Sequence, residues 1–399
     1  KATPVKVTAL ENVIDITVGN ENTMAVKADG TVWSWGYNGY GQLGDGTGSN
    51  RNKPVQVIKN NGTPLTKIVK ITSGNNKTIA LDTEGNVWAW GYGYESTATK
   101  LSKLENIIDI SADYAADQTG KVYKISDYTQ IEAEKVIRIS QGYNHTLFLR
   151  NDGKGYAIGN NEKGQLGQGD SKNTSKPVFI QNEYGTDAIK NIKELKAGKQ
   201  FSIALMKDGT TYVWGANENY KLATTQDTNQ MLPKKNDRIN KAISVDAGQN
   251  NGAMINKDGF VYTWGLGKYG ALGNKLYNTT DELTLVGRED VGLSSNNITI
   301  HPGEQYNLTV TNKTFNVIKD VVDNSQMNYT TGNSNIANIT QNGTITGIQT
   351  GKTTIEVNKE GTDYTSIAQV TVLPENVEIE PMALTNGSHT VILKANGTV

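Results

Sequence analysis

The chain has 399 residues, with 39 Lys and Arg against 40 Asp and Glu, and no cysteine. A net charge of −1 gives no electrostatic reason to expect binding to nucleic acid or to an anionic membrane. The lack of cysteine excludes a disulfide scaffold, thiol catalysis and zinc–cysteine sites, and no apolar run is long enough for a spanning helix. The 42 glycines suit a β structure rich in turns.

A short pattern recurs along the chain, first as VKADGTVWSWG from Val26 to Gly36. Further copies begin at Leu81, Ala115, Leu149, Leu205 and Ile255, and a seventh begins at Leu393. Alternating apolar residues around an Asp-Gly turn predict a β-hairpin, because glycine tolerates a positive φ. Each copy therefore predicts two antiparallel strands.

Two further strands are predicted around each hairpin. One precedes it, in the stretches 13–19, 69–74 and 136–142. The other follows it near Pro54, Pro177 and Pro233. The turn glycines from Gly30 to Gly259 are 33 to 56 residues apart. Four short strands at this spacing predict the blades of a β-propeller, with the short third unit as a trimmed blade.

Two of the repeats carry a longer signature. GNENTMAVKADGTVWSWGYNGYGQLGDGT runs from Gly19 to Thr47, and the fourth repeat contains GYNHTLFLRNDG and then GNNEKGQLGQGD. The Trp-Gly pair, the Asn-x-x-Gly-Gln-Leu-Gly loop and the trailing Pro-Val resemble RCC1-type repeats, a propeller family named after a regulator of chromosome condensation. The resemblance covers about residues 1–287 and the tail from about 376. Repeats two, three and five lack much of the loop motif, so it implies the fold there but no loop shape.

The stretch after the sixth repeat has a different character. NSNIANITQNGTITGIQTGKTTIEV, from Asn333 to Val357, is rich in Thr, Ile and Asn and contains no Trp. It resembles the bacterial Ig-like modules of surface proteins. Their pattern is filled here by Asn335, Ala337, Gly343, Gly347, Gly351 and Ile355. Short strands separated by Gly or Asn turns also fit a small sandwich without that resemblance.

We therefore expect an all-β protein in three segments. The propeller occupies residues 1–289, the bacterial Ig-like β-sandwich 290–374, and 375–399 begins a further RCC1-like repeat. A propeller removes unpaired strand edges when one terminus completes the blade begun by the other. The tail and the N-terminal stretch 2–10 thus predict a seven-bladed propeller, with the sandwich inserted before the last, shared blade. The start at Lys1 and the lack of a signal peptide indicate a piece excised from a longer protein.

Tyrosines gather in the loops that join first to second and third to fourth strands, which share one face of the predicted propeller. They are Tyr37, Tyr40, Tyr92, Tyr94, Tyr143, Tyr220 and Tyr269. Tyrosine offers a large contact area at low entropic cost and is favoured in recognition surfaces. These seven are the candidate ligand-binding residues, although for any single one packing within its own loop is favoured over ligand contact.

Catalytic and metal-binding signatures are absent from the sequence. GLGKYG (265–270) is a literal Gly-x-Gly-x-x-Gly, but no helical pattern follows it. GIQTGKTT (347–354) is one residue too short for a phosphate loop and lies between predicted strands. The repeat slot of His145 and His389 is filled elsewhere by Asn22, Lys77, Phe201 and Asn251. A slot so varied disfavours a metal ligand or a general base, and we expect no enzyme activity and no cofactor.

The leading functional hypothesis is a non-catalytic binding or display module of a bacterial surface or secreted protein. It rests on the Ig-like resemblance, the missing catalytic motifs and the apparent excision from a longer chain. It predicts an extracellular or cell-surface location, a protein or glycan ligand, no nucleic-acid partner and no membrane insertion of this segment. The alternative, implied by the RCC1 resemblance, is a protein–protein regulator such as a guanine nucleotide exchange factor or an enzyme inhibitor. An enzyme around the central channel is disfavoured, and a purely architectural role stays open.

Overall fold

The computed structural model describes residues 5, 7–257, 260–274, 277–286, 292–295, 297–314, 317–322, 327–359, 365–374, 382–386 and 389–393. The expected turn at Gly259, the expected boundary at 289–290 and the seventh repeat after Leu393 lie outside these residues. So do residues 2–4 and 6 of the expected N-terminal strand, whose described end forms a turn closed by a hydrogen bond from Leu10 N–H to the Val7 carbonyl oxygen (3.3 Å). Leu10 is buried beside Val13 and Ile16, so the chain reverses there into the first sheet.

Six four-stranded antiparallel sheets follow one another along the chain, each in simple meander order. Sheets 1 to 3 contain β1 (Val13–Val18), β2 (Asn22–Lys27), β3 (Val32–Gly36), β4 (Arg51–Gln56); β5 (Ile68–Gly74), β6 (Lys77–Asp82), β7 (Val87–Gly91), β8 (Thr99–Lys100); and β9 (Ile107–Ile110), β10 (Tyr114–Asp117), β11 (Val122–Lys124), β12 (Gln130–Ile131). Sheets 4 to 6 contain β13 (Val136–Gln141), β14 (His145–Arg150), β15 (Gly155–Gly159), β16 (Thr174–Phe179); β17 (Ile192–Ala197), β18 (Phe201–Met206), β19 (Thr211–Gly215), β20 (Gln230–Lys235); and β21 (Ala242–Ala247), β22 (Asn251–Asn256), β23 (Val261–Gly265), β24 (Thr280–Leu285). The predicted strands of these units are confirmed, and sheet 3 is the shortened one.

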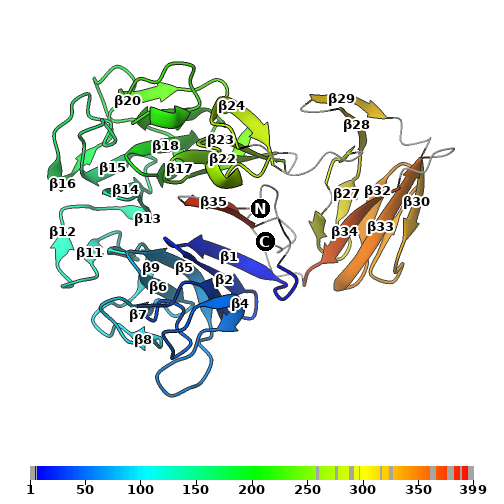
Figure 1. Cartoon of the computed structure of the whole chain (residues 1–399), viewed down its shortest axis with the longest axis horizontal. Helices are drawn as coiled ribbons and strands as arrows, with labels where there is room; N and C mark the ends of the chain where they lie inside the picture. Colours follow the sequence, from blue (N-terminus) through cyan, green and yellow to red (C-terminus); the bar gives the residue numbers. More distant parts are fainter. Residues whose placement is uncertain are drawn as a thin grey trace.

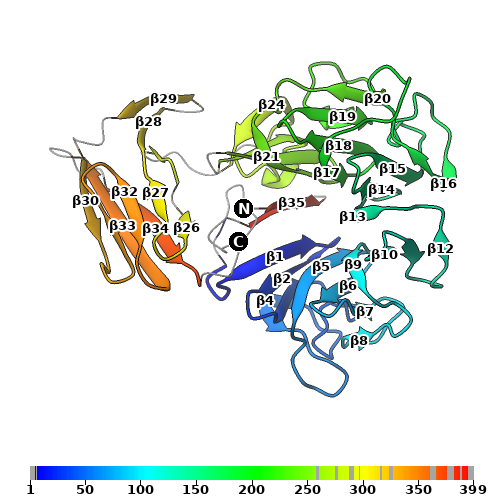
Figure 2. The same ribbon diagram turned by 180° about the vertical axis from the view of Figure 1, so that it is seen from behind.

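The sheets are arranged around a common axis like the blades of a propeller. In Figure 1 the first strands β1, β5, β9, β13 and β17 lie toward the middle of the ring, and β8, β12, β16 and β20 lie at its outside. A turned view shows the same arrangement from behind (Figure 2). Because every sheet is a meander, the loops after its first and third strands leave from one end. We call this end of the ring the loop face and the opposite end the hairpin-turn face.

Neighbouring sheets are fastened together at the hairpin-turn face. Gly30, at the turn between β2 and β3, has φ 76°, and a Cβ there would lie 2.6 Å from the Lys67 backbone nitrogen. Glycine lets the turn approach sheet 2 this closely, and the Ile68 N–H donates to the Gly30 carbonyl oxygen (3.1 Å). The same bond recurs from Ile107 to Gly85 (3.1 Å), from Val136 to Gly120 (3.0 Å) and from Ile192 to Gly153 (3.0 Å). The Asp-Gly signal of the sequence therefore marks a hairpin turn and a joint between sheets.

Further along the chain, residues 292–372 form ten more strands. They are β25 (Gly292–Leu293), β26 (Asn297–Ile300), β27 (Gln305–Asn307), β28 (Val310–Thr314), β29 (Val317–Val322), β30 (Met327–Thr331), β31 (Ala337–Ile339), β32 (Thr344–Gly347), β33 (Gly351–Lys359) and β34 (Thr365–Val372). One sheet has the order β26-β34-β33-β30, and β27-β32-β31 and β25-β28-β29 form two more. Their buried core, from Leu293 to Val372, is drawn only from this segment among the described residues.

A final hairpin, β35 (Met382–Asn386) with β36 (His389–Leu393), returns to the ring. β35 contacts β21 and β22 of sheet 6, and both hairpin strands contact β1 of sheet 1. Figure 1 shows β35 between these sheets, on the inner side of the ring. The chain therefore places its tail at the junction between the sixth and the first sheet.

Candidate functional site on the loop face

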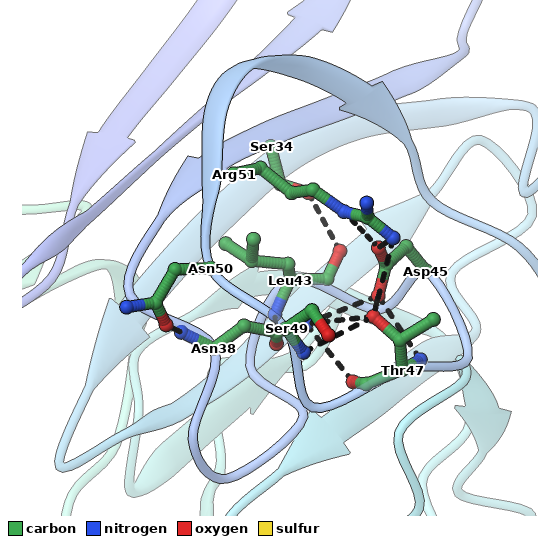
Figure 3. A network of polar contacts seen from close by, with 8 residues as sticks. All are labelled: Ser34, Asn38, Leu43, Asp45, Thr47, Ser49, Asn50 and Arg51. Carbon is green, nitrogen blue, oxygen red and sulfur yellow. Dashed lines mark hydrogen bonds and ion pairs between the residues drawn. The ribbon is translucent and has the colours of Figure 1, made fainter.

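Asn38 organises the long loop between β3 and β4 from inside (Figure 3). Its buried side chain accepts a hydrogen bond from the Leu43 N–H (2.9 Å) and donates to Asp45 Oδ1 (3.0 Å) and the Thr47 carbonyl oxygen (2.9 Å). Its own backbone N–H donates to Asn50 Oδ1 (2.8 Å). One amide thus satisfies backbone groups at several points of an irregular loop, which would otherwise leave buried polar groups unpaired.

The corresponding loop of sheet 4 repeats this network around Asn161. Leu166 N–H donates to Asn161 Oδ1 (2.8 Å), and Asn161 Nδ2 donates to the Asp170 carbonyl oxygen (2.9 Å) and to Asp170 Oδ1 (3.0 Å). The Asn161 backbone N–H donates to Asn173 Oδ1 (2.6 Å). The shared loop shape follows from the shared Asn-x-x-Gly-Gln-Leu-Gly sequence.

Sheet 5 forms the same network without the full motif. Leu222 N–H donates to Asn217 Oδ1 (2.8 Å), and Asn217 Nδ2 donates to Thr224 Oγ1 (2.7 Å) and to the Gln226 carbonyl oxygen. The spacing from the asparagine to the leucine is what the three loops share, so it was the signal that could have predicted the loop shape. Tyr220 stands where sheets 1 and 4 have Gly41 and Gly164, and it keeps their positive φ (57°, against 76° and 82°).

Tryptophan fastens each long loop to the next sheet. The second Trp of the hairpin motif is fully buried and donates its indole N–H to a carbonyl oxygen in the loop of the preceding sheet. This bond joins Trp90 to Gln42 (2.9 Å), Trp214 to Gln165 (2.9 Å) and Trp264 to Lys221 (2.8 Å). The predicted packing role of the tryptophans between sheets is confirmed, and the loop face is as firmly held as the sheets below it.

Three of the seven candidate tyrosines come together. Tyr40, from the β3–β4 loop, lies edge-on to Tyr92, from the β7–β8 loop, with ring centres 5.4 Å apart, and Tyr37 lies 6.2 Å from Tyr40. Tyr40 and Tyr92 are 48% and 61% exposed. Their backbones are fixed, since Tyr40 N–H donates to the buried Gln42 Oε1 (2.9 Å) and Tyr92 N–H to the Asn76 carbonyl oxygen (2.9 Å). We call Tyr37, Tyr40 and Tyr92 the aromatic patch.

The other four tyrosines are not brought into that patch by any ring contact in the described structure. Tyr94 packs against the core between sheets 2 and 3. Tyr143 is 64% exposed and lies under the Lys199 ammonium at 5.3 Å, and Tyr269 is 65% exposed beside Lys268. Tyr220 is half-buried in its 3-10 turn. The tyrosines therefore do not form one continuous surface.

A cavity of about 910 Å³ runs along the ring axis and is lined by the first strands of all six sheets. Charged side chains at the third position of these strands alternate in sign, in the order Asp15, Lys70, Asp109, Arg138 and Glu194. The carboxylates accept backbone N–H groups of the next sheet, from Ile71 (2.8 Å), Ile139 (2.6 Å) and Val245 (3.3 Å), respectively. These bonds between sheets account for the buried acids without a catalytic role.

Two buried titratable groups have strongly shifted pKa values. Burial raises the pKa of Asp15 to about 6, partly offset by the Ile71 N–H and by Lys70. Burial lowers the pKa of His145 to about 3. Its Nε2 lies 2.8 Å from Ser202 Oγ, and because that hydroxyl donates to the Gln165 carbonyl oxygen (2.8 Å), Nε2 carries the hydrogen. A neutral, enclosed imidazole is a packing group.

Metal and membrane sites were searched over the part of the chain that the structure describes. No group of three or more His, Cys, Asp or Glu side chains there is placed to hold a metal ion. In that same part, no helix has the length and apolar character needed to span a bilayer.

Comparisons with known proteins identify the repeats. A model of the RCC1-like domain matches residues 1–344. The chain is 29% identical over 268 residues to the ultraviolet-B receptor UVR8 of Arabidopsis thaliana, and 28% identical over 249 residues to the human E3 ubiquitin-protein ligase HERC2. These matches cover 66% and 61% of this chain, but only 55% and 5% of the two relatives.

The solved structure of Prp20p from Saccharomyces cerevisiae has the same fold, with a TM-score of 0.61 at 22% identity. It covers 71% of this chain and 79% of its own. The family match spans most of the chain, and the ring of four-stranded sheets agrees with it. The chain belongs to the RCC1-like domain family.

Proposed function

We propose that this chain is a non-catalytic, protein-binding regulatory module that acts through its loop face. The observation that carries the proposal is the aromatic patch, two of whose rings are exposed and held on fixed backbone. Rigid aromatic anchors dominate protein interfaces because they bury a large area at a small entropic cost. The patch spans two sheets, so a partner docking there would contact both.

The relatives support a protein partner over a glycan. Prp20p was studied for its binding to Gsp1p and histones, and yeast RCC1 (Prp20) was solved bound to Kap60. A further relative, 24% identical over 241 residues, is the yeast guanine nucleotide exchange factor SRM1. These facts favour the protein–protein regulator over the surface-display hypothesis, for which no relative named here speaks. Fold alone does not transmit function, so exchange-factor activity is tested separately, with a nucleotide-exchange assay on small GTPases.

A crosslinking experiment tests the partner and the surface together. A photoreactive phenylalanine analogue replaces Tyr40 or Tyr92, and the chain is irradiated in the cells that produce it. The same analogue replaces Asp208, an exposed turn residue at the hairpin-turn face of sheet 5, as the control. We expect one protein to be captured from both tyrosine positions and not from Asp208.

The captured protein is then purified, and its affinity is measured for Tyr40→Ser/Tyr92→Ser. We expect about a tenfold or greater loss, since each aromatic anchor contributes on the order of 1–2 kcal/mol. Equal capture from both faces, or an affinity that the double substitution leaves unchanged, would refute the assignment of the loop face.

For the architecture, we propose a seven-bladed ring whose seventh blade begins with the β35–β36 hairpin. Its support is the position of the hairpin between β21 and β1. We also propose that residues 290–374 form an Ig-like sandwich inserted before that blade, supported by the separate core from Leu293 to Val372. Deleting 290–374 and joining the ends with a flexible linker should leave the ring folded. Unfolding of the ring on that deletion would contradict the insertion.

The cell-surface location is likewise a proposal, supported only by the Ig-like resemblance. Fractionation of the source cells with an antibody to this segment decides it. Recovery in the wall or the medium supports a surface protein, and recovery in the cytosol supports an intracellular regulator.

A further inference from the structure

A lysine cluster lies on the loop face above sheets 4 and 5, apart from the aromatic patch. Lys221 is fully buried, and its Nζ lies 2.7 Å from Glu218 Oε1, whose side chain is 54% exposed. The Lys163 and Lys199 ammonium groups act on this same ion pair, and they contribute to lowering the pKa of both partners. We call Lys163, Lys199, Lys221 and Glu218 the lysine cluster; three positive charges there face one negative charge.

The cluster is held in place by its loops. Lys163 N–H donates to the buried Gln165 Oε1 (2.9 Å), and Lys199 N–H donates to the Gly248 carbonyl oxygen of sheet 6 (2.9 Å). Lys199 also lies 5.3 Å from the centre of the exposed Tyr143 ring. The positive charges therefore occupy fixed positions beside an exposed aromatic ring.

Two of the lysines lack a carboxylate of their own. Lys77, on the same face above sheet 2, is paired with Asp113 at 2.8 Å. Among the described residues, no carboxylate lies within ion-pair distance of Lys163 or Lys199. Both side chains are half-buried, so part of the cost of removing water from them has already been met in the free protein. Such groups gain more from an incoming anion than fully hydrated lysines do.

We propose that the lysine cluster, with Tyr143, is a subsite for a carboxylate-rich segment of the protein partner. The inference rests on the proposed function, because it assigns acidic chemistry to that same partner. A local excess of two positive charges fits a few carboxylates. Nucleic acid is disfavoured, because its binding needs many phosphate contacts and the whole chain carries a net charge of −1. Complementary charge would steer the partner onto this face.

The test measures binding of a fluorescein-labelled, glutamate-rich peptide by fluorescence anisotropy at low salt. We compare the unsubstituted chain with Lys163→Gln/Lys199→Gln, which removes two charges without touching the buried Lys221. The matched control is Lys207→Gln, an exposed lysine at the hairpin-turn face of sheet 5. We expect the double substitution to weaken binding about tenfold, and Lys207→Gln to leave it unchanged.

Two further arms keep the interpretation separate. Replacing the glutamates of the peptide with glutamine should abolish binding to the unsubstituted chain. Tyr40→Ser/Tyr92→Ser should leave peptide binding intact, so failure of the aromatic patch as a docking site would not be mistaken for failure of this subsite. Peptide binding that survives Lys163→Gln/Lys199→Gln overturns the inference. So does an oligonucleotide that binds more tightly than the peptide and is lost in that variant.

Discussion

The loop face above sheets 1 and 2 and the loop face above sheets 4 and 5 have the same interior and different surfaces. In both, a buried asparagine ties the long loop together, and a buried tryptophan of the following sheet donates to a Gln carbonyl oxygen at 2.9 Å. Above the first pair stands the aromatic patch, and above the second stands the lysine cluster. The repeat therefore conserves the parts that hold a blade together and leaves the exposed positions free to differ.

This difference separates residues of the scaffold from residues of recognition. Asn38 and Asn161 are fully buried with every neighbour in their own repeat, whereas Tyr92 and Lys199 are reachable by a partner. Substitution of the first kind should cost stability equally in both regions. Substitution of the second kind should change binding and leave stability nearly unaltered.

The largest effect is expected from removing the loop asparagines. Asn38→Ala and Asn161→Ala each leave a buried leucine N–H without its acceptor, which should lower the free energy of unfolding by about 3 kcal/mol. Urea unfolding measures both. Asn61→Ala, in an exposed turn, serves as the control and should cost about 0.5 kcal/mol or less. A loss in one loop and none in the other would show that the two interiors are not equivalent.

The junctions between first strands should differ in pH dependence. Asp15, with its pKa raised to about 6, joins sheets 1 and 2, whereas the neutral Ser140 hydroxyl accepts the Ala197 N–H (3.0 Å) between sheets 4 and 5. A folded-state pKa above the unfolded value means that the folded chain holds the extra proton, so stability from this group is lost as pH rises from about 4 to about 6. Asp15→Asn keeps an acceptor for the Ile71 N–H and should be more stable than the unsubstituted chain by about 2 kcal/mol above pH 6.

Below about pH 4 the Asp15→Asn advantage should vanish, because Asp15 is then neutral in both states. Ser140→Ala should change stability by the same amount at every pH. Thermal unfolding across this range checks both variants, and a difference between Asp15→Asn and the unsubstituted chain that does not depend on pH would contradict the account of Asp15.

A smaller effect is expected from the tryptophan bonds. Trp90→Phe and Trp214→Phe keep an aromatic ring but remove the indole N–H that reaches the preceding loop, which should cost about 1–2 kcal/mol each. Trp33, whose indole donates to Thr31 within its own hairpin (3.2 Å), is the matched control. Chemical unfolding of Trp33→Phe should show the smaller loss; an equal loss would remove the special role of the bond between sheets.

The sequence predicted the repeated frame well because its signals are local. The Asp-Gly turns, the alternating strands and the Trp-Gly endings each depend on a few adjacent residues, and the structure places strands where they were expected. The loop of sheet 5 was not foreseen, since Asn217 and Leu222 keep their spacing while the residues between them change. The number of blades and the Ig-like insertion stay predictions.

The candidate site was harder to predict because it depends on which loops become neighbours. All seven tyrosines are similar in sequence position, yet Tyr94 enters the core and Tyr40 meets Tyr92 from the next sheet. The lysine cluster joins residues from three separate loops around one glutamate. No periodicity reveals that Lys221 is buried or that Lys199 lacks a carboxylate partner.

The most direct test of the central claim is the partner's affinity for Tyr40→Ser/Tyr92→Ser, measured together with that variant's free energy of unfolding. If the aromatic patch is a recognition surface on an independent frame, affinity falls about tenfold or more while stability changes by about 0.5 kcal/mol or less. Unchanged affinity, or an affinity that falls only because the chain unfolds, would contradict it.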